Sequence, residues 1–156
     1  MLIRKAEEKD AEQIINLLKQ ILELHASIRP DIFIPGTTKY TKEEVITIIN
    51  DENRRTYVAD RNGTVTGYAL CEIRKQPFSN NMVPFTLLFI DDLCVESGAR
   101  GRHVGTRLFE FVKNEARRMG CYEVTLNVWE GNDAAKAFYE KMGMKPKETQ
   151  MELILR

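Results

Sequence analysis

The chain has 156 residues, of which 43% are hydrophobic and 29% charged, so we expect residues 1–156 to bury the core of one domain. Its 23 basic and 23 acidic residues cancel, which argues against a nucleic-acid partner or a membrane-surface role. With no apolar run of membrane-spanning length and no signal-peptide pattern, the sequence predicts a cytoplasmic protein.

The first predicted elements are a short strand, Leu2–Lys5, and a helix whose apolar face runs from Ile14 to His25. Asp10 is expected to cap this helix, with Gln13 in the capping-box position. The helix is expected to end before Pro30.

Residues 25–40 are apolar in places but have no periodicity, so they either form one wall of a substrate cleft or pack as a loop over the core. Thr41 and Glu44 then predict a second capping box at the start of a short helix.

A hairpin follows, because strand-like segments at 56–60 and 64–74 flank Asn62-Gly63, the strongest short signal for a tight turn. Residues 76–84 are expected to form an exposed connection.

The segment Phe85–Val95 reads as a buried central strand that contains two adjacent acids, Asp91 and Asp92. Carboxylates in such a strand need a partner, a shifted pKa or a cleft. Since neighbours on a strand point to opposite faces, we expect only one of the two to face a cleft.

A basic turn, Arg100–Thr106, joins this strand to a helix expected at 104–119 that ends at Gly120. The first turn of a helix leaves N–H groups free and attracts anions, and Gly101 and Gly105 allow a ligand to approach the backbone. We therefore predict a di- or polyphosphate ligand, although a surface turn with solvated arginines is the equal alternative. The turn is neither a P-loop nor the dinucleotide fingerprint.

The last predicted elements are a strand at 122–128, a helix capped by Asn132 or Asp133 that ends at Gly143, and a final strand at 150–155. The buried side of the helix is expected to carry Ala134, Ala135, Phe138 and Met142. The final strand is expected to lie antiparallel beside its neighbour.

This order of elements predicts a mixed, mainly antiparallel sheet flanked by helices, with one late strand-helix-strand crossover (α/β, or α+β mixed). A cleft should open where the central strand and the 122–128 strand separate.

The cysteines, Cys71, Cys94 and Cys121, are odd in number, lack metal-ligand spacing and predict no metal site. They read as small core residues in a reducing compartment. A nucleophilic Cys94 is a weaker alternative, because little nearby would lower the pKa of its thiol.

Two blocks, FIDDLCVESGARGRHVGTRLFEFV and VTLNVWEGNDAAKAFYEKMGM, resemble the GCN5-related N-acetyltransferase (GNAT) superfamily in this order and at this separation. The resemblance covers nearly the whole chain and implies a fold with a splayed pair of parallel strands that holds the cofactor. The turn departs from the family pattern at His103, which stands at the place of a glycine. A residue there is tolerated if its φ angle stays negative.

The resemblance implies acetyl transfer from acetyl-CoA to a primary amine by direct attack. The implied cofactor residues form the strand end, the turn and the last helix: Leu93, Cys94, Val95, Arg100, Gly101, Arg102, His103, Val104, Gly105, Thr106, Asn132 and Phe138.

The implied acid that protonates the departing thiolate is Tyr139. A carboxylate must deprotonate the amine, and Asp91 is the first candidate and Asp92 the second. His25 and His103 are alternative bases, each more readily explained as structural or phosphate-facing.

Other functions remain open at this point: a CoA-binding or sensing module without efficient transfer, or a protein that binds a different phosphate ligand. The acids, together with Glu72, favour a basic acceptor such as a polyamine or a peptide amine. Exposed edge strands allow a homodimer.

Overall fold

The computed structural model describes residues 1–76 and 79–156; residues 77 and 78 of the expected connection lie outside the described part. The elements, in chain order, are β1 (Leu2–Lys5), a short 3₁₀ turn η1 (Glu8–Asp10), α1 (Ala11–Ile28), α2 (Lys42–Ile49), β2 (Arg54–Arg61), β3 (Thr64–Gln76), β4 (Phe85–Val95), a second 3₁₀ turn η2 (Ser97–Ala99), α3 (Val104–Arg118), β5 (Glu123–Leu126) and α4 (Asp133–Lys141).

The strands form one five-stranded sheet in the order β1-β2-β3-β4-β5. The first four strands pair antiparallel, and β4 pairs parallel with β5 through the crossover helix α3. This is the mixed, mainly antiparallel sheet that the sequence predicts.

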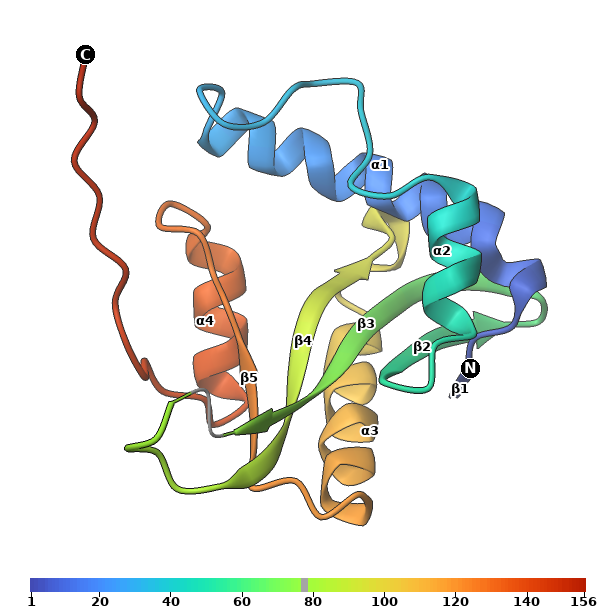
Figure 1. Ribbon diagram of the computed structural model, residues 1–156. Coiled ribbons are helices and arrows are strands. Elements are labelled where there is room, and N and C mark those ends of the chain that lie inside the picture. The colour runs from blue at the N-terminus through green and yellow to red at the C-terminus, as the bar shows by residue number, and fades with distance from the viewer. Residues whose placement is uncertain (77–78) are drawn as a thin grey trace.

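Helices cover both faces of the sheet (Figure 1). On one face, α1 and α2 pack through side chains such as Leu18 and Val45 onto Tyr68 and Leu70 of β3. On the other face, α3 packs through Leu108 and its neighbours onto the opposite side of the same strands. Gly67 lets α3 approach β3 closely, since a Cβ there would lie 2.9 Å from Leu108 Cδ1.

The local signals for the second helix and the hairpin are confirmed. The Thr41 hydroxyl accepts from the Glu44 N–H at 3.2 Å, and the Glu44 carboxylate accepts from the Thr41 N–H at 3.2 Å. Asn62 and Gly63 both have positive φ, 52° and 90°, as a tight turn between twisted strands requires.

Asp10 stands at the N-cap position of α1, as predicted, but its side chain does not act as the cap. Its side chain makes no cap bond and is instead buried against Arg4, whose guanidinium donates to both carboxylate oxygens at 2.8 and 2.9 Å. Gln13 does not complete a capping box either, because its amide bonds the backbone of Gly63 and Val65. Long-range partners outweigh the local pattern here.

The C-terminal part differs most from expectation. Residues 145–156 form no strand, and the extended segment passes alongside α4 (Figure 1), tied to the rest of the chain through the side chains of Lys147 and Glu152. In α4 no side chain is fully buried: Ala134 is exposed, while Phe138 and Met142 are half-buried. A single chain therefore offers the last strand no neighbour and leaves most of α4 uncovered.

Candidate active site

The site lies where β5 stops following β4. The two strands pair only from Leu87 to Ile90 on β4, although β4 continues to Val95. Within residues 1–76 and 79–156, the edge of β4 from Asp91 to Val95 has no strand on the β5 side. An extended ligand with amide groups can pair with such a free edge as an added strand does.

The free edge leads into the turn before α3, whose backbone amides point to no acceptor in the described chain. Between Gly101 and Thr106 no N–H donates to a backbone or side-chain oxygen of the described residues, and the first helical bond starts at Arg107. Arg100, Arg102 and His103 are exposed beside these amides. A helix start with free N–H groups and adjacent cations is suited to bind a phosphate.

His103 caps α3 with a φ of +61°, in the left-handed region. The condition given for a non-glycine residue here, a negative φ, is therefore not met. Gly101 has a φ of +81° in the same turn. The turn needs left-handed backbone at both positions, and a non-glycine residue there costs roughly 1–2 kcal/mol. Histidine is one of the residue types found there more often than most.

Asp91 and Asp92 point to the same side of the sheet. The expectation that these neighbours point to opposite faces is therefore wrong. The pairing of β3 with β4 steps from Leu70–Asp92 to Cys71–Ile90, so Asp91 has no partner residue on β3. This β-bulge adds one residue to β4 and turns the next side chain back to the first face. Both carboxylates therefore face the side covered by α1 and α2.

Asp91 accepts two hydrogen bonds from the segment that joins α1 to α2. The Lys39 Nζ atom lies 3.1 Å from its Oδ1, and the Tyr40 hydroxyl donates to its Oδ2 at 2.7 Å. Burial, followed by the hydrogen bond to Asp91, raises the pKa of Tyr40 to about 12. The Asp91 side chain is 17% exposed, so a ligand can still reach it.

Asp92 lies deeper and accepts a hydrogen bond from the Tyr68 hydroxyl at 3.0 Å. Removal from solvent raises the pKa of Asp92 to about 6, although the nearby Lys39 and the Tyr68 hydroxyl oppose the shift. A carboxyl group with such a pKa exchanges its proton close to neutral pH.

Tyr139 comes from α4, on the opposite side of the β4 edge. Its ring packs between Phe109 and Phe138, with centroids 6.0 and 5.1 Å away. Burial raises the pKa of Tyr139, with the charge of Asp92 adding to the effect. The phenol therefore keeps its proton at neutral pH. Phe138 also lies against the helix start, since a Cβ on Gly105 would lie 3.4 Å from its ring.

Of the two cap candidates for α4, the structure selects Asn132, whose Oδ1 accepts from the Ala135 N–H at 3.3 Å. The side chains of Cys94 and Val104 point into the core, so only their backbone can face a ligand. Burial also raises the pKa of the Cys94 thiol to about 12, which keeps it protonated and disfavours a nucleophilic role.

Several site residues could not be found from the sequence. Lys39 and Tyr40 lie in the segment without periodicity, and Tyr68 reads as an ordinary strand residue. Phe33 of the same segment stacks between His25 and Trp129, at 5.2 and 5.3 Å, and so connects α1 to the loop after β5. The same segment, through Lys39 and Tyr40, also makes the contacts to Asp91.

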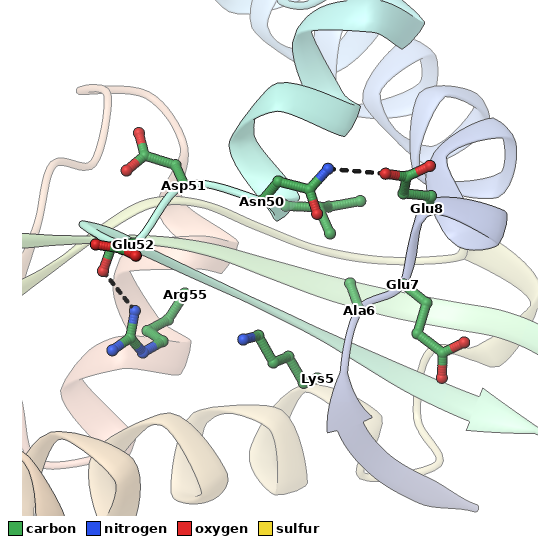
Figure 2. Close-up of a pocket in the computed structure, with 9 residues that line it drawn as sticks. Lys5, Ala6, Glu7, Glu8, Asn50, Asp51, Glu52 and Arg55 are labelled. Carbon is green, nitrogen blue, oxygen red and sulfur yellow. Dashed lines mark hydrogen bonds between the residues drawn. The ribbon is translucent and has the colours of Figure 1, made fainter.

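A separate hollow of about 850 Å³ lies beside β1 and β2, at the other edge of the sheet (Figure 2). Two of its polar side chains have partners close by: Asn50 donates to Glu8, and Arg55 donates to the Glu52 carbonyl. No cluster of metal-ligating side chains occurs among the described residues. The same residues include no helix that is both long and apolar enough to span a membrane.

Comparison with known proteins agrees with this geometry. The Acetyltransferase (GNAT) family matches residues 18–144. The chain belongs to this family. Glucosamine 6-phosphate N-acetyltransferase of Arabidopsis thaliana is 42% identical over 62 residues, which are 40% of either chain. The chain thus spans about two fifths of the length of the curated relatives that it matches.

Solved structures match over much more of this GNAT chain. The crystal structure of a mutant of the BH1408 protein from Bacillus halodurans is 29% identical with a TM-score of 0.95, covering 100% of both chains. That match therefore includes the C-terminal segment. The crystal structure of glucosamine-6-phosphate N-acetyltransferase from Arabidopsis thaliana is 28% identical with a TM-score of 0.71, covering 99% of this chain and 98% of the other.

Proposed function

We propose that residues 1–156 act as one N-acetyltransferase domain that transfers the acetyl group of acetyl-CoA to a primary amine. The observation that carries this proposal is the free edge of β4 leading directly into the unpaired amides from Gly101 to Thr106. The edge suits the amide groups of pantetheine, and the turn suits the pyrophosphate. Membership in the GNAT family supports the choice of acetyl-CoA.

In this arrangement the N–H groups near Leu93 to Val95 would orient pantetheine and polarise the thioester carbonyl. Arg100 and Arg102 would neutralise phosphate charge. Asn132 would hold the start of α4 beside the cofactor, and Phe138 would close the space next to Gly105.

The transfer requires a base beside the acceptor amine and an acid beside the departing thiolate. The acceptor arrives as an ammonium ion and gives its proton to Asp91, directly or through water. The amine nitrogen then bonds to the thioester carbonyl carbon, the carbon–sulfur bond breaks, and the thiolate takes the proton of Tyr139. The nitrogen loses its second proton to solvent, which leaves the neutral amide, and solvent returns a proton to the Tyr139 phenolate. The raised pKa of Tyr139 favours the donor role. Asp92 is the second candidate for the base, since its pKa of about 6 allows proton exchange.

The acceptor is expected to be a small-molecule or peptide amine. Lys39 shows that an amine can bind at Asp91, because its ammonium group lies 3.1 Å from that carboxylate. The hydroxyl of the neighbouring Tyr40 donates to the other oxygen of Asp91. A substrate amine would displace Lys39 and take the same position. The relatives named above act, by their names, on glucosamine 6-phosphate, which therefore belongs in any acceptor panel with polyamines and peptide amines.

A thiol-release assay with acetyl-CoA and this amine panel tests the proposal. The wild type should release CoA thiol with at least one amine, and Tyr139→Phe should release it at least tenfold more slowly while binding CoA equally well. CoA binding without thiol release from any amine would make the protein a sensing module. Equal thermal protection by ATP, NAD and CoA would instead indicate a general phosphate-binding protein.

We further propose a cytoplasmic location. The three cysteines are free, which suits a reducing compartment such as the cytoplasm. We also propose a homodimer.

A further inference from the structure

Lys39 brings an amine of the chain itself to the position proposed for the acceptor. Its Nζ atom lies 3.1 Å from Oδ1 of Asp91, the first candidate for the base. The ammonium also lies 5.6 Å from the centre of the Tyr40 ring, within the range of a cation–π contact. The hydroxyl of that ring donates to the other oxygen of Asp91 at 2.7 Å. Two contacts therefore hold the Lys39 amine against the carboxylate.

A second lysine nearby shows what is particular about Lys39. Lys42, the first residue of α2, pairs with Glu12 at the same distance, 3.1 Å. The two lysine side chains are almost equally exposed, 47% for Lys39 and 52% for Lys42. Their partners differ, because the side chain of Asp91 is 17% exposed and that of Glu12 is 71% exposed. Lys42 thus forms an ordinary surface ion pair, whereas Lys39 reaches a carboxylate inside the candidate site.

The place proposed for the thioester lies within reach of the Lys39 amine. Asp91 begins the part of β4 that has left β5, and Leu93, near the amides that would polarise the thioester carbonyl, stands two residues farther along. Two residues of a strand span about 6.6 Å. A lysine amine stands on a flexible stem with four rotatable carbons, so it can move several ångströms about a fixed backbone. A rotation of the Lys39 side chain would therefore bring its amine to the thioester.

We propose that the chain transfers an acetyl group from bound acetyl-CoA to its own Lys39 when no acceptor amine is present. The inference rests on the proposed function, because it uses the same cofactor, base and acid.

The steps of this self-acetylation follow those of the transfer to an acceptor. The Lys39 ammonium gives one proton to Asp91, and its nitrogen bonds to the thioester carbonyl carbon. The carbon–sulfur bond breaks, and the thiolate takes the proton of Tyr139. The nitrogen loses its second proton to solvent, Asp91 also releases its proton to solvent, and solvent returns a proton to the Tyr139 phenolate. The products are Nζ-acetylated Lys39, CoA and one proton.

This reaction is intramolecular and ends after one turnover. Because the amine and the base belong to one chain, the effective concentration of the amine is high and does not depend on the concentration of the protein. Acetylation removes the charge of a lysine and its ability to form a salt bridge. Acetylated Lys39 can therefore neither accept a second acetyl group nor compete as a cation for Asp91, which is then free for an arriving acceptor.

Mass spectrometry of the protein incubated with acetyl-CoA alone tests the proposal. Peptide mapping should place one acetyl group per chain on Lys39, at an occupancy at least about tenfold that of Lys42. Lys42 is the internal control, because it reports the spontaneous acetylation of a lysine of similar exposure. The half-time of acetylation at Lys39 should stay the same when the protein is diluted tenfold.

Three variants separate enzymatic from spontaneous acetylation. Lys39→Arg keeps the positive charge but offers no lysine amine, so the acetyl group should disappear from the peptide that contains this position. Lys42→Arg is the matched control and should leave the acetylation of Lys39 unchanged. Tyr139→Phe should slow the acetylation of Lys39 at least tenfold, because the departing thiolate loses its proton donor.

Equal acetylation of Lys39 and Lys42 would overturn the proposal, as would a rate that falls on dilution or an unchanged rate in Tyr139→Phe. An acetyl group already on Lys39 after purification supports the proposal if the purified Tyr139→Phe protein lacks it, and contradicts the proposal if both proteins carry it.

The thiol-release assay separates this inference from the proposed function. Turnover with an amine of the panel while Lys39 stays unmodified in acetyl-CoA alone would refute self-acetylation and leave the proposed function standing. Release of one thiol per chain, with acetyl on Lys39 and no further release with any amine, would refute transfer to a free acceptor and leave self-acetylation standing.

Discussion

Two glycines at the ends of α3 allow the proposed role of the turn Gly101–Thr106 in CoA binding to be tested through the backbone alone. Gly101, in the turn before the helix, has a φ of +81°, and Gly120, directly after it, has a φ of +74°. An added Cβ would meet nothing within 4 Å at either position. Substitution by alanine therefore changes the backbone preference at each position without causing a steric clash.

The strain of an alanine in left-handed backbone is roughly 1–2 kcal/mol at each position. At Gly120 the end of α3 depends on this conformation, so the strain of the alanine should lower the stability of the folded protein. We expect Gly120→Ala to lower the free energy of unfolding by about 1 kcal/mol after the gain from a stiffer unfolded chain. The Tm should then fall by roughly 2–4 °C.

At Gly101 the turn is exposed and can relax into another conformation in the free protein. The strain should then appear when the ligand requires the original turn, and 1–2 kcal/mol corresponds to a roughly 5–30-fold rise in the Kd for CoA. Isothermal titration calorimetry measures the Kd, and thermal melting measures the Tm. Gly101→Ala with wild-type affinity, or Gly120→Ala with the larger loss of affinity, would refute the role of the turn.

Four further variants test other parts of the account. His103→Gly should relieve left-handed strain and raise the unfolding free energy by about 0.5–1 kcal/mol in urea titrations; a decrease would argue against the φ of +61°. Asp91→Asn should lower kcat by about 10²- to 10⁴-fold, and part of the rate should return at alkaline pH, where the free amine is abundant. Asp92→Asn should mainly alter the pH dependence of kcat near pH 6. Equal losses of kcat in the two variants would show that Asp91 is not the base. Arg4→Met leaves the buried Asp10 carboxylate unpaired and should cost about 3–5 kcal/mol. Burial raises the pKa of Asp10, but Arg4 and a backbone N–H lower it below its usual value. The wild type should therefore lose stability as the pH falls below about 4, and acid unfolding curves should show a smaller loss for Arg4→Met.

The sequence predicts the scaffold of the site well because its signals are local. The helical spacing after Val104, the glycine that ends α3 and the Asn62-Gly63 turn each act within a few residues, and the structure has all of them. The order of these elements is enough to predict a mixed sheet with one parallel crossover, and with it the edge at which β4 and β5 separate.

The orientation of the site residues depends on contacts between distant segments. Whether Asp91 and Asp92 face one side or two depends on the bulge, which the pairing of β4 with β3 decides. The partner of Asp91, Lys39, lies 52 residues away in a segment without periodicity. Asp10 likewise binds Arg4 although its local pattern predicts a helix cap. None of these contacts has a signature within a window of neighbouring residues.

The C-terminal segment, residues 145–156, shows a different limit. Its residues favour a strand, but a strand forms only beside another strand, and the chain places this segment beyond bonding reach of β5. The prediction of a strand at residues 150–155 is wrong for one chain.

Titration of the ¹⁵N-labelled protein with CoA tests the central claim most directly, because each backbone amide reports for itself. The account predicts that the largest shifts fall on the amides from Gly101 to Thr106 and on those of Leu93 to Val95. Shifts centred instead on the hollow beside β1 and β2, around Lys5 and Arg55, with the turn before α3 unchanged, would contradict it.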